Sequence, residues 1–264
     1  MGHPDAWLRR SAGRGRSLTL VRLDRSTPTP EPAGRAAQAV RPRDAASLVV
    51  YDDRCNPPRF LMGLRSARHV FMPGHLVFPG GKLETSDAHL AADLCRRASF
   101  ARRTATTSSP APLRDIALVL AAIRETFEET GVMICEPARF RSRAPFWRDF
   151  AQRGVRPANR QLVPMARAVA PEGFVRRYDT RFFLVSRGYA MQAIATPPTD
   201  EFDMVEWMTA DEAACFPLIE VTRAVLAQAA AWIETGRFDR FRHPLTRLRP
   251  HVGSTFGEQA PRWT

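Results

Sequence analysis

Lysine and long apolar stretches are both scarce in this sequence. The 264 residues include 39 lysines and arginines, and Lys82 is the sole lysine among them. The longest uninterrupted apolar run, 116–123, is eight residues long, whereas a membrane-spanning helix needs about 20. Residues 1–20 contain arginines but no apolar stretch behind them. The sequence therefore predicts neither a membrane span nor an ordinary secretory signal.

Cysteine is also sparse, and its four copies are scattered. None of them forms a C-x-x-C pair, which argues against a thiolate zinc site. Separate thiols are typical of a reducing compartment, so we expect a cytoplasmic protein. The four are Cys55, Cys95, Cys135 and Cys215.

Acidic residues are outnumbered, 27 against 39 basic ones, which gives a net charge of +12. The excess is concentrated in residues 1–45, 139–160 and 237–264. It indicates either a polyanionic partner or a general replacement of lysine by arginine. None of the three stretches is a tight basic stripe interleaved with aromatic residues, so we expect no nucleic-acid partner.

The composition divides the chain into three parts. Residues 1–45 carry the segment "STPTPEP" and little apolar periodicity, so we expect a poorly ordered basic extension. Residues 237–264 are rich in Arg and Pro, and we expect an irregular tail. Residues 46–236 should form one folded domain.

Within 46–236, strand and helix patterns are mixed, which favours an α/β layered domain. The clearest helix is 113–130, with Gly131 placed where a C-terminal glycine would end it. Thr209 and Glu212 form a capping box that opens another helix. The other expected strands are 46–53, 59–66, 76–78, 162–170, 180–188 and 203–208, and the other expected helices are 144–154 and 218–236.

Three glutamates at the end of helix 113–130 are the most informative residues. Glu125 and Glu129 lie one turn apart on the same helix face, and Glu128 is beside them. Their charges repel one another, and the helix dipole disfavours negative charge at a C-terminus. A hard divalent cation with oxygen ligands would compensate both effects. The alternative is a solvated acidic turn, partly neutralised by Arg124.

A glycine turn stands upstream of this helix. The segment "FPGG" ends in Gly80 and Gly81, and two consecutive glycines let backbone groups approach a phosphate or a metal closely. Such turns are common, so the signal lies in the combination of the turn with the acidic helix end.

The combination resembles the Nudix hydrolases. Their motif runs Gly, five residues, Glu, seven residues, and then Arg-Glu-apolar-x-Glu-Glu-x-Gly-apolar. The second half stands here without a departure as "RETFEETGV", Arg124 to Val132. The first half begins at Gly81, but Asp87 takes the position of the first Glu. Between Asp87 and Arg124 there are 36 residues rather than seven.

An insertion at this point resembles one Nudix subgroup, the peroxisomal coenzyme A and acyl-CoA diphosphatases of animals with their bacterial relatives. The segments "FMPGHLVFPGG" and "RRYDTRFFL" look like parts of that subgroup, as does "LMGLRS", although the Leu-Arg-Arg that follows in the subgroup is replaced here. The inserted residues, 88–112, begin with a helical pattern and end in the loop-forming "RRTATTSSPAP". We expect a surface excursion beside the site.

The resemblance implies a Nudix-type α/β/α sandwich with a mixed β-sheet, and a reaction that depends on Mg²⁺ or Mn²⁺. Glu125 and Glu129 correspond to the metal-binding carboxylates, with Glu128 as a further ligand or base. Arg124 would orient this cluster by pairing with an acid. Whether the shorter Asp87 reaches the helix stays open.

Other residues extend the expected site. Gly80 or Gly81 would offer a backbone carbonyl near the metal or the substrate. Nudix enzymes often recruit one more acid from a later loop, and Glu201 is preferred over Glu206 because it lies in a loop rather than in a strand.

Two arginines are expected to bind the phosphates of the substrate. Arg65 and Arg68 lie between a strand and the glycine turn, and a guanidinium binds phosphate oxygens in pairs.

The sequence therefore predicts a metal-dependent Nudix pyrophosphohydrolase. On the subgroup resemblance, the substrate is CoA or an acyl-CoA, cleaved to 3′,5′-ADP and a phosphopantetheine. An ADP-ribose or NADH pyrophosphatase is the enzymatic alternative. A basic nucleic-acid-binding protein with a non-catalytic Nudix domain is the alternative from another class, and the intact "RETFEET" argues against it.

Overall fold

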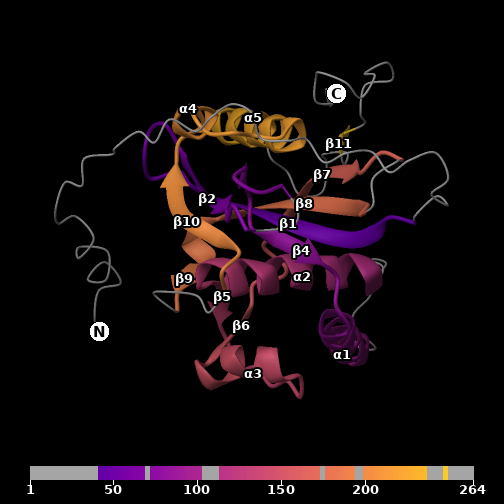
Figure 1. The fold of residues 1–264 in the computed structure, drawn as a ribbon. Coiled ribbons are helices and arrows are strands. Elements are labelled where there is room, and N and C mark those ends of the chain that lie inside the picture. The colour runs from indigo at the N-terminus through magenta and orange to yellow at the C-terminus, as the bar shows by residue number, and fades with distance from the viewer. Residues whose placement is uncertain are drawn as a thin grey trace. The chain divides into compact units, whose positions relative to one another are not determined.

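A mixed β-sheet forms the centre of the computed structural model (Figure 1), which describes residues 41–68, 72–102, 113–172, 176–193, 199–236 and 246–248. Its strands are β1 (Arg43–Asp52), β2 (Arg59–Arg65), β3 (Leu76–Val77), β4 (Gly80–Lys82), β7 (Val163–Val169), β8 (Tyr178–Ser186), β10 (Phe202–Met208) and β11 (Thr246–Leu248). The strand order is β10–β2–β1–β8–β7–β11, with β3 paired to β2 and β4 paired to β1. β1 runs parallel to β8, and β7 runs parallel to β11, whereas the other pairs are antiparallel.

The central strand β1 supplies side chains to both faces of the sheet. Ala46, Leu48 and Val50 pack into one hydrophobic core. Val49 and Tyr51 pack into the other. Because successive side chains of a strand point to opposite faces, a continuous apolar run is what a strand covered on both sides requires.

Helices cover both faces of the sheet (Figure 1). On one side lie α1 (Thr85–Arg102) and α2 (Leu113–Thr130), whose buried residues share a core with Leu48. On the other side lie α4 (Ala210–Ala214) and α5 (Glu220–Thr235), whose buried residues share a core with Val49. The expected α/β/α sandwich with a mixed sheet is confirmed.

A smaller sheet and a short helix extend the core beneath α2. The sheet has the order β6–β5–β9, formed by β5 (Val132–Pro137), β6 (Val155–Pro157) and β9 (Ala190–Gln192). Helix α3 (Pro145–Gln152) contributes Phe146, Trp147 and Phe150, which contact one another edge-on or tilted. Phe127 of α2 meets Phe146 and Phe150 in edge-on contacts, so the helix that carries the acidic residues is anchored from below.

Most of the expected elements are present, with three corrections. Strand β1 begins at Arg43 rather than Ala46, because Arg43 pairs across the sheet with Tyr178. The glycine turn is itself a strand, since β4 pairs with Ala45–Ser47 of β1. The tail 237–264 is not wholly irregular, because β11 lies within it and pairs with β7. The expected extension at 1–40 lies outside the described residues.

The helical start expected for the inserted segment is present and packs into the core. The segment opens inside α1, an 18-residue helix that begins at Thr85. Leu90 and Ala91 of this helix are buried in the core shared with α2. The loop-forming part, 103–112, lies outside the described residues.

None of the helices in the described part of the chain has the length and the apolar character that a membrane span needs.

Candidate active site

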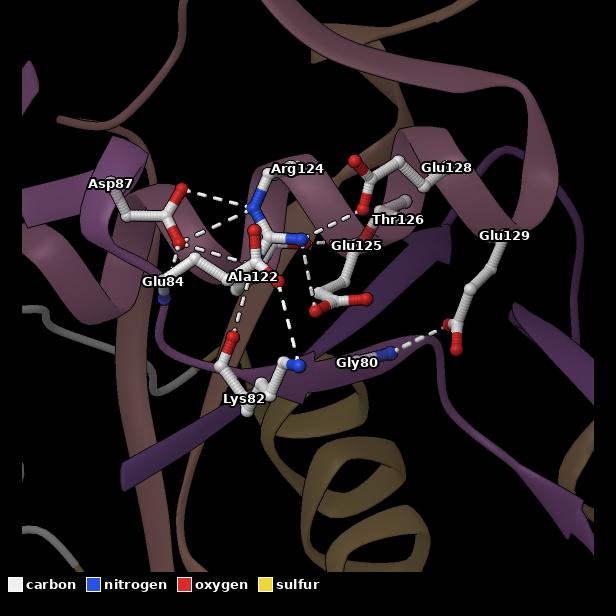
Figure 2. Close-up of polar contacts among 10 residues, drawn as sticks. All are labelled: Gly80, Lys82, Glu84, Asp87, Ala122, Arg124, Glu125, Thr126, Glu128 and Glu129. Atoms are coloured by element: carbon white, nitrogen blue, oxygen red, sulfur yellow. Dashed lines mark hydrogen bonds and ion pairs between the residues drawn. The ribbon is translucent and has the colours of Figure 1, made fainter. Parts of the chain in front are cut away.

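The end of helix α2 has a defined position next to strand β4. Gly131 has a φ of 71°, a left-handed conformation that glycine adopts without a steric penalty. Its N–H donates to the carbonyl of Phe127 over 2.9 Å and so ends the helix. The backbone of the three glutamates in the last two turns is therefore held in the helix (Figure 2).

Arg124 is the centre of the polar network in Figure 2. Its side chain is only 3% exposed. It donates to Glu128 Oε2 over 2.7 Å, to the carbonyl of Lys82 over 3.0 Å and to Asp87 Oδ2 over 3.0 Å. Its Nη1 also lies 3.0 Å from Glu125 Oε1. One buried guanidinium thus joins α1, β4 and the acidic end of α2.

Asp87 reaches helix α2 from the first turn of α1. Its side chain is fully buried, and its Oδ1 accepts from Arg124 Nε over 3.1 Å. Its Oδ2 also accepts from the backbone N–H of Glu84 over 3.0 Å, which fixes the start of α1. Burial raises the pKa of Asp87, and the neighbouring guanidinium opposes that shift. The aspartate therefore makes the contact that the sequence left open.

Two backbone groups of this network carry no sequence signal. They are the carbonyl of Lys82 and the N–H of Glu84. Any residue type supplies such groups, so only the pairing of β4 with β1 and the start of α1 could place them.

Gly80 and Gly81 leave room for the glutamates of α2. Gly80 donates its N–H to Glu129 Oε2 over 2.8 Å. A Cβ on Gly80 would lie 2.6 Å from the Cα of Ser47, and one on Gly81 would overlap the carboxylate of Glu125, with Oε2 at 2.7 Å. Position 80 therefore requires glycine, because its nearest neighbours are backbone atoms, whereas a side chain at position 81 would displace the carboxylate of Glu125. The structure shows an N–H at Gly80 that binds a carboxylate. A backbone carbonyl of Gly80 or Gly81 near the metal stays a prediction.

Glu129 is the most buried glutamate of the site, at 2% exposure. Its Oε1 is buried and has no hydrogen-bond partner within the described residues. Burial raises the pKa of Glu129 well above its usual value, a contact with the Glu201 carboxyl raises it further, and the charge of Arg65 opposes the shift. A buried carboxylate with an unpartnered oxygen is costly unless a cation compensates it.

The pKa values of the other two glutamates are also raised. Burial raises the pKa of Glu125 to about 7, with Arg124 opposing the shift and the charges of Glu128 and Glu201 adding to it. Burial also raises the pKa of Glu128, although Arg124 binds it directly. The site thus holds more negative charge than its single buried guanidinium neutralises.

The fit of these residues to a metal ion rests on that excess of charge. The unpartnered Oε1 of Glu129 is an oxygen ligand of the kind that Mg²⁺ and Mn²⁺ prefer. Within the described residues, no three His, Cys, Asp or Glu side chains form a ready-made metal site. Glu128 in particular is turned to Arg124. The acidic residues therefore suit a divalent cation without enclosing one on their own.

The remaining expected residues divide into two groups. Glu201 lies close enough to Glu129 and Glu125 to raise the pKa of both. Arg65 ends β2, and its charge acts on Glu129. By contrast, Glu206 is exposed on β10, and Arg68 is exposed in the turn after β2. The structure brings Glu201 and Arg65 to the acidic cluster and leaves Glu206 and Arg68 at the surface.

Comparison with known proteins concerns the fold and the segment that carries the glutamates. A family model described as the NUDIX domain matches residues 114–229. A crystal structure of a NUDIX hydrolase from Alicyclobacillus acidocaldarius is 24% identical, with a TM-score of 0.54, and the match covers 78% of this chain and 97% of that chain. This likeness supports the fold.

Two further solved structures resemble the chain less. A MutT NUDIX hydrolase from Burkholderia pseudomallei is 16% identical over 72% of this chain and 98% of its own, with a TM-score of 0.42. The NUDIX domain of Shewanella oneidensis NrtR, crystallised with ADP ribose, is 13% identical over 73% and 88%, with a TM-score of 0.41.

The family match begins at Arg114 and contains the whole of "RETFEETGV", whose arginine and glutamates form the network described above. The fold around that segment is the one found in a solved NUDIX hydrolase. The chain is thus similar to the NUDIX domain over residues 114–229 and shares the fold of a solved NUDIX hydrolase.

Proposed function

We propose that the protein is a Nudix-type hydrolase of phosphorus anhydrides. It cleaves the diphosphate of CoA or an acyl-CoA, with Mg²⁺ or Mn²⁺, to give 3′,5′-ADP and a phosphopantetheine. The observation that carries the catalytic part is the buried Asp87–Arg124 contact at 3.0 Å. It joins the two separated halves of the motif, so the long insertion leaves the charged network of the site intact.

Glu125 and Glu129 are the residues that would hold the cation, with Glu128 as the further carboxylate. The unpartnered Oε1 of Glu129 and the raised pKa of Glu125 both favour this assignment. When bound, the cation neutralises charge that develops at phosphorus and lowers the pKa of a water molecule. Arg124 keeps Glu125 in place through a 3.0 Å contact and so positions the cluster.

Glu201 is the residue to which we assign proton acceptance from the attacking water. It faces Glu129 from the segment before β10, so its carboxyl lies at the edge of the acidic cluster rather than within α2. A carboxylate within hydrogen-bond reach of the attacking water is a suitable general base. Glu128 is the alternative base, since it also borders the cluster.

The substrate assignment rests on the resemblance to the CoA diphosphatases and on the arginines beside the glycine strand. Arg65 lies at the acidic cluster, and exposed Arg68 follows it by three residues. A guanidinium fork suits the 3′-phosphate that distinguishes CoA from dephospho-CoA. ADP-ribose or NADH, which lack that phosphate, are the competing substrates.

The test is to measure kcat/KM for CoA, dephospho-CoA, ADP-ribose and NADH on one preparation. A charge-assisted contact to the 3′-phosphate should favour CoA over dephospho-CoA by roughly 10- to 100-fold. Arg68→Gln should reduce that ratio, whereas Arg96→Gln, which breaks an exposed ion pair on α1, should not. Equal values for CoA and dephospho-CoA would contradict the CoA assignment and leave a general nucleoside-diphosphate hydrolase.

A further inference from the structure

We infer that Gly63 and Phe202 are positioning residues: their contact sets the carboxyl of Glu201 beside Glu129. This inference rests on the role given above to Glu201. Neither Gly63 nor Phe202 belongs to the Nudix motif, and neither has a polar side chain that would indicate a catalytic role.

Phe202 packs against Gly63 because glycine has no side chain. Gly63 lies in the middle of β2, which pairs with β10. A Cβ on Gly63 would overlap the ring of Phe202, with Cγ at 2.7 Å. The ring therefore occupies the space that a side chain at position 63 would fill. The centroid of the same ring lies 5.9 Å from the guanidinium carbon of Arg65, which is a cation–π contact.

A break in the strand pairing then redirects the chain next to Glu201. Phe202 pairs with Arg65 and Met204 pairs with Leu64, so the register shifts between them and Asp203 is the extra residue. The Asp203 carboxylate accepts from the N–H of Ala67 over 3.3 Å. A bulge of this kind aims neighbouring side chains in a direction that a regular strand does not allow.

The backbone of Glu201 is held at both of its polar groups. Its carbonyl accepts from the N–H of Ser66 over 2.9 Å, and its N–H donates to Thr199 Oγ1 over 3.2 Å. With the backbone fixed on one side by these bonds and on the other by the ring of Phe202, the carboxyl has a limited set of positions. In the position that it takes, the carboxyl lies close enough to Glu129 to raise the pKa of that residue.

The position matters for the step assigned to Glu201. The water oxygen forms a new bond to phosphorus, the bond from that phosphorus to the bridging oxygen breaks, and the leaving group departs as a phosphomonoester. The water proton passes to the Glu201 carboxylate. A displacement of about 1 Å in such a group lowers the rate by up to roughly 100-fold. A change at Gly63 should therefore act on turnover through Glu201.

The experiment is a double-mutant cycle on the panel substrate that the wild-type protein hydrolyses fastest. Glu201→Gln should lower kcat by about 100-fold or more. Gly63→Ala should lower kcat by roughly 10- to 100-fold with little change in KM, because it shifts Phe202 and with it Glu201. In the Glu201→Gln background, Gly63→Ala should cause no further loss, since two changes that act through one group are not additive.

Two more variants keep the result interpretable. Phe202→Leu loosens the same contact without introducing an overlap, and it should lower kcat only while Glu201 is present. Gly188→Ala is the matched control, because a Cβ there meets only Ser186 Oγ at 3.6 Å, and it should leave kcat and the unfolding midpoint unchanged.

The outcomes separate the inference from the proposed function. If Gly63→Ala lowers kcat equally in the wild-type and Glu201→Gln backgrounds, the positioning role is overturned and the role of Glu201 stands. Phe202→Leu replaces Gly63→Ala in this comparison if Gly63→Ala does not fold. Wild-type kcat in Glu201→Gln would overturn both assignments, while hydrolysis by the remaining carboxylates would stand. A loss confined to the background that contains Glu201 supports the inference.

Discussion

At the scale of single residues, Asp87 illustrates how a shorter carboxylate keeps the site together. An aspartate reaches less far than the glutamate of the Nudix motif, yet it contacts Arg124 from a fully buried position. It does so because Asp87 belongs to the first turn of α1, which packs against α2. The backbone of α1 thus brings the carboxylate to the guanidinium.

Asp87→Asn should destabilise the protein by about 3–5 kcal/mol, because it leaves the buried Arg124 without its main charged partner from α1. Urea unfolding monitored by circular dichroism measures the change. Asp93→Asn on the same helix is the control, because it breaks only an exposed pair with Arg96 and should cost less than about 1 kcal/mol. Equal costs for both variants would contradict the structural role of Asp87.

Glu129→Gln should lower kcat by roughly 100-fold or more while the fold stays intact. The amide keeps the shape of the side chain but removes the charge that a divalent cation would meet at Oε1. Turnover over a range of Mg²⁺ concentrations, with circular dichroism as the check on folding, measures the effect. Near-normal turnover at low Mg²⁺ would remove Glu129 from the metal site.

Glu125 should make the metal-free protein less stable at alkaline pH. Its folded pKa of about 7 lies above the usual 4.5, so the folded state holds the proton more tightly than the unfolded state. The resulting stabilisation is complete below pH 4.5 and is lost as pH rises through about 7. The loss from this group is on the order of 3 kcal/mol.

Urea unfolding in EDTA at about pH 5 and about pH 8 tests this dependence, because the two conditions bracket most of the titration. Glu125→Gln should lose part of the pH dependence, and Mg²⁺ at the higher pH should stabilise the wild type more than the variant. A wild type whose metal-free stability rises with pH in this window, unchanged by Glu125→Gln, would contradict the prediction.

The helix pattern predicted one half of the site. Glu201 was expected there only from the family resemblance, and the contacts that bring the remote residues to the helix were not predicted. Helix periodicity alone places Glu125, Glu128 and Glu129 together, because residues three and four apart share a face. The contact from Asp87 spans 36 residues and depends on the packing of α1 against α2, which no local pattern encodes. The approach of Glu201 depends on a bulge between distant strands, for the same reason.

At the scale of secondary-structure elements, α1 contributes residues to the core and is not only a surface helix. Leu90 is only 2% exposed and packs in the core that also contains Leu120 and Ile123 of α2. The helix therefore joins the catalytic helix to the inserted segment. The expectation of a surface excursion left out this packing, because the apolar residues of α1 are few and its pattern is weak.

Leu90→Ala should destabilise the protein by about 2–5 kcal/mol, because it removes buried methyl groups and leaves a cavity against α2. Urea unfolding measures the cost. Because α1 also carries Asp87, the variant should have a lower kcat as well as a lower free energy of unfolding. Leu113→Ala is the control, since Leu113 is exposed at the start of α2 and should change stability little. A small cost at Leu90 would show that α1 packs loosely.

Elements with strong local signals were predicted well, and three short strands without such signals were not. Helix α2 has the predicted bounds, because its periodicity and its terminal glycine are both local. Strands β6, β9 and β11 have three residues each, and no local pattern distinguishes so short a strand from a loop. They are strands only because β5 and β7 offer edges to pair with.

At the scale of the whole molecule, the surplus of arginine is partly used inside the structure. Arg114 and Arg167 both bind Asp179, and Arg187 binds Asp52, which lies at the end of β1. These pairs join strand ends to one another and to α2. These arginines thus have structural roles in ion pairs, while the chain as a whole keeps its net positive charge.

The last prediction is that RNA neither binds this protein tightly nor inhibits it specifically. The remaining excess of positive charge gives weak, salt-sensitive attraction, but a basic groove with stacking aromatics is what tight binding of single strands needs. Among the described residues, the one large apolar side chain counted as exposed is Leu113, which is not aromatic. Fluorescence anisotropy with a labelled RNA should show binding that vanishes between about 50 and 200 mM salt, while turnover of the best diphosphate substrate persists. Binding that survives the higher salt, in a protein without Mg²⁺-dependent turnover, would instead favour a nucleic-acid-binding protein with a non-catalytic domain.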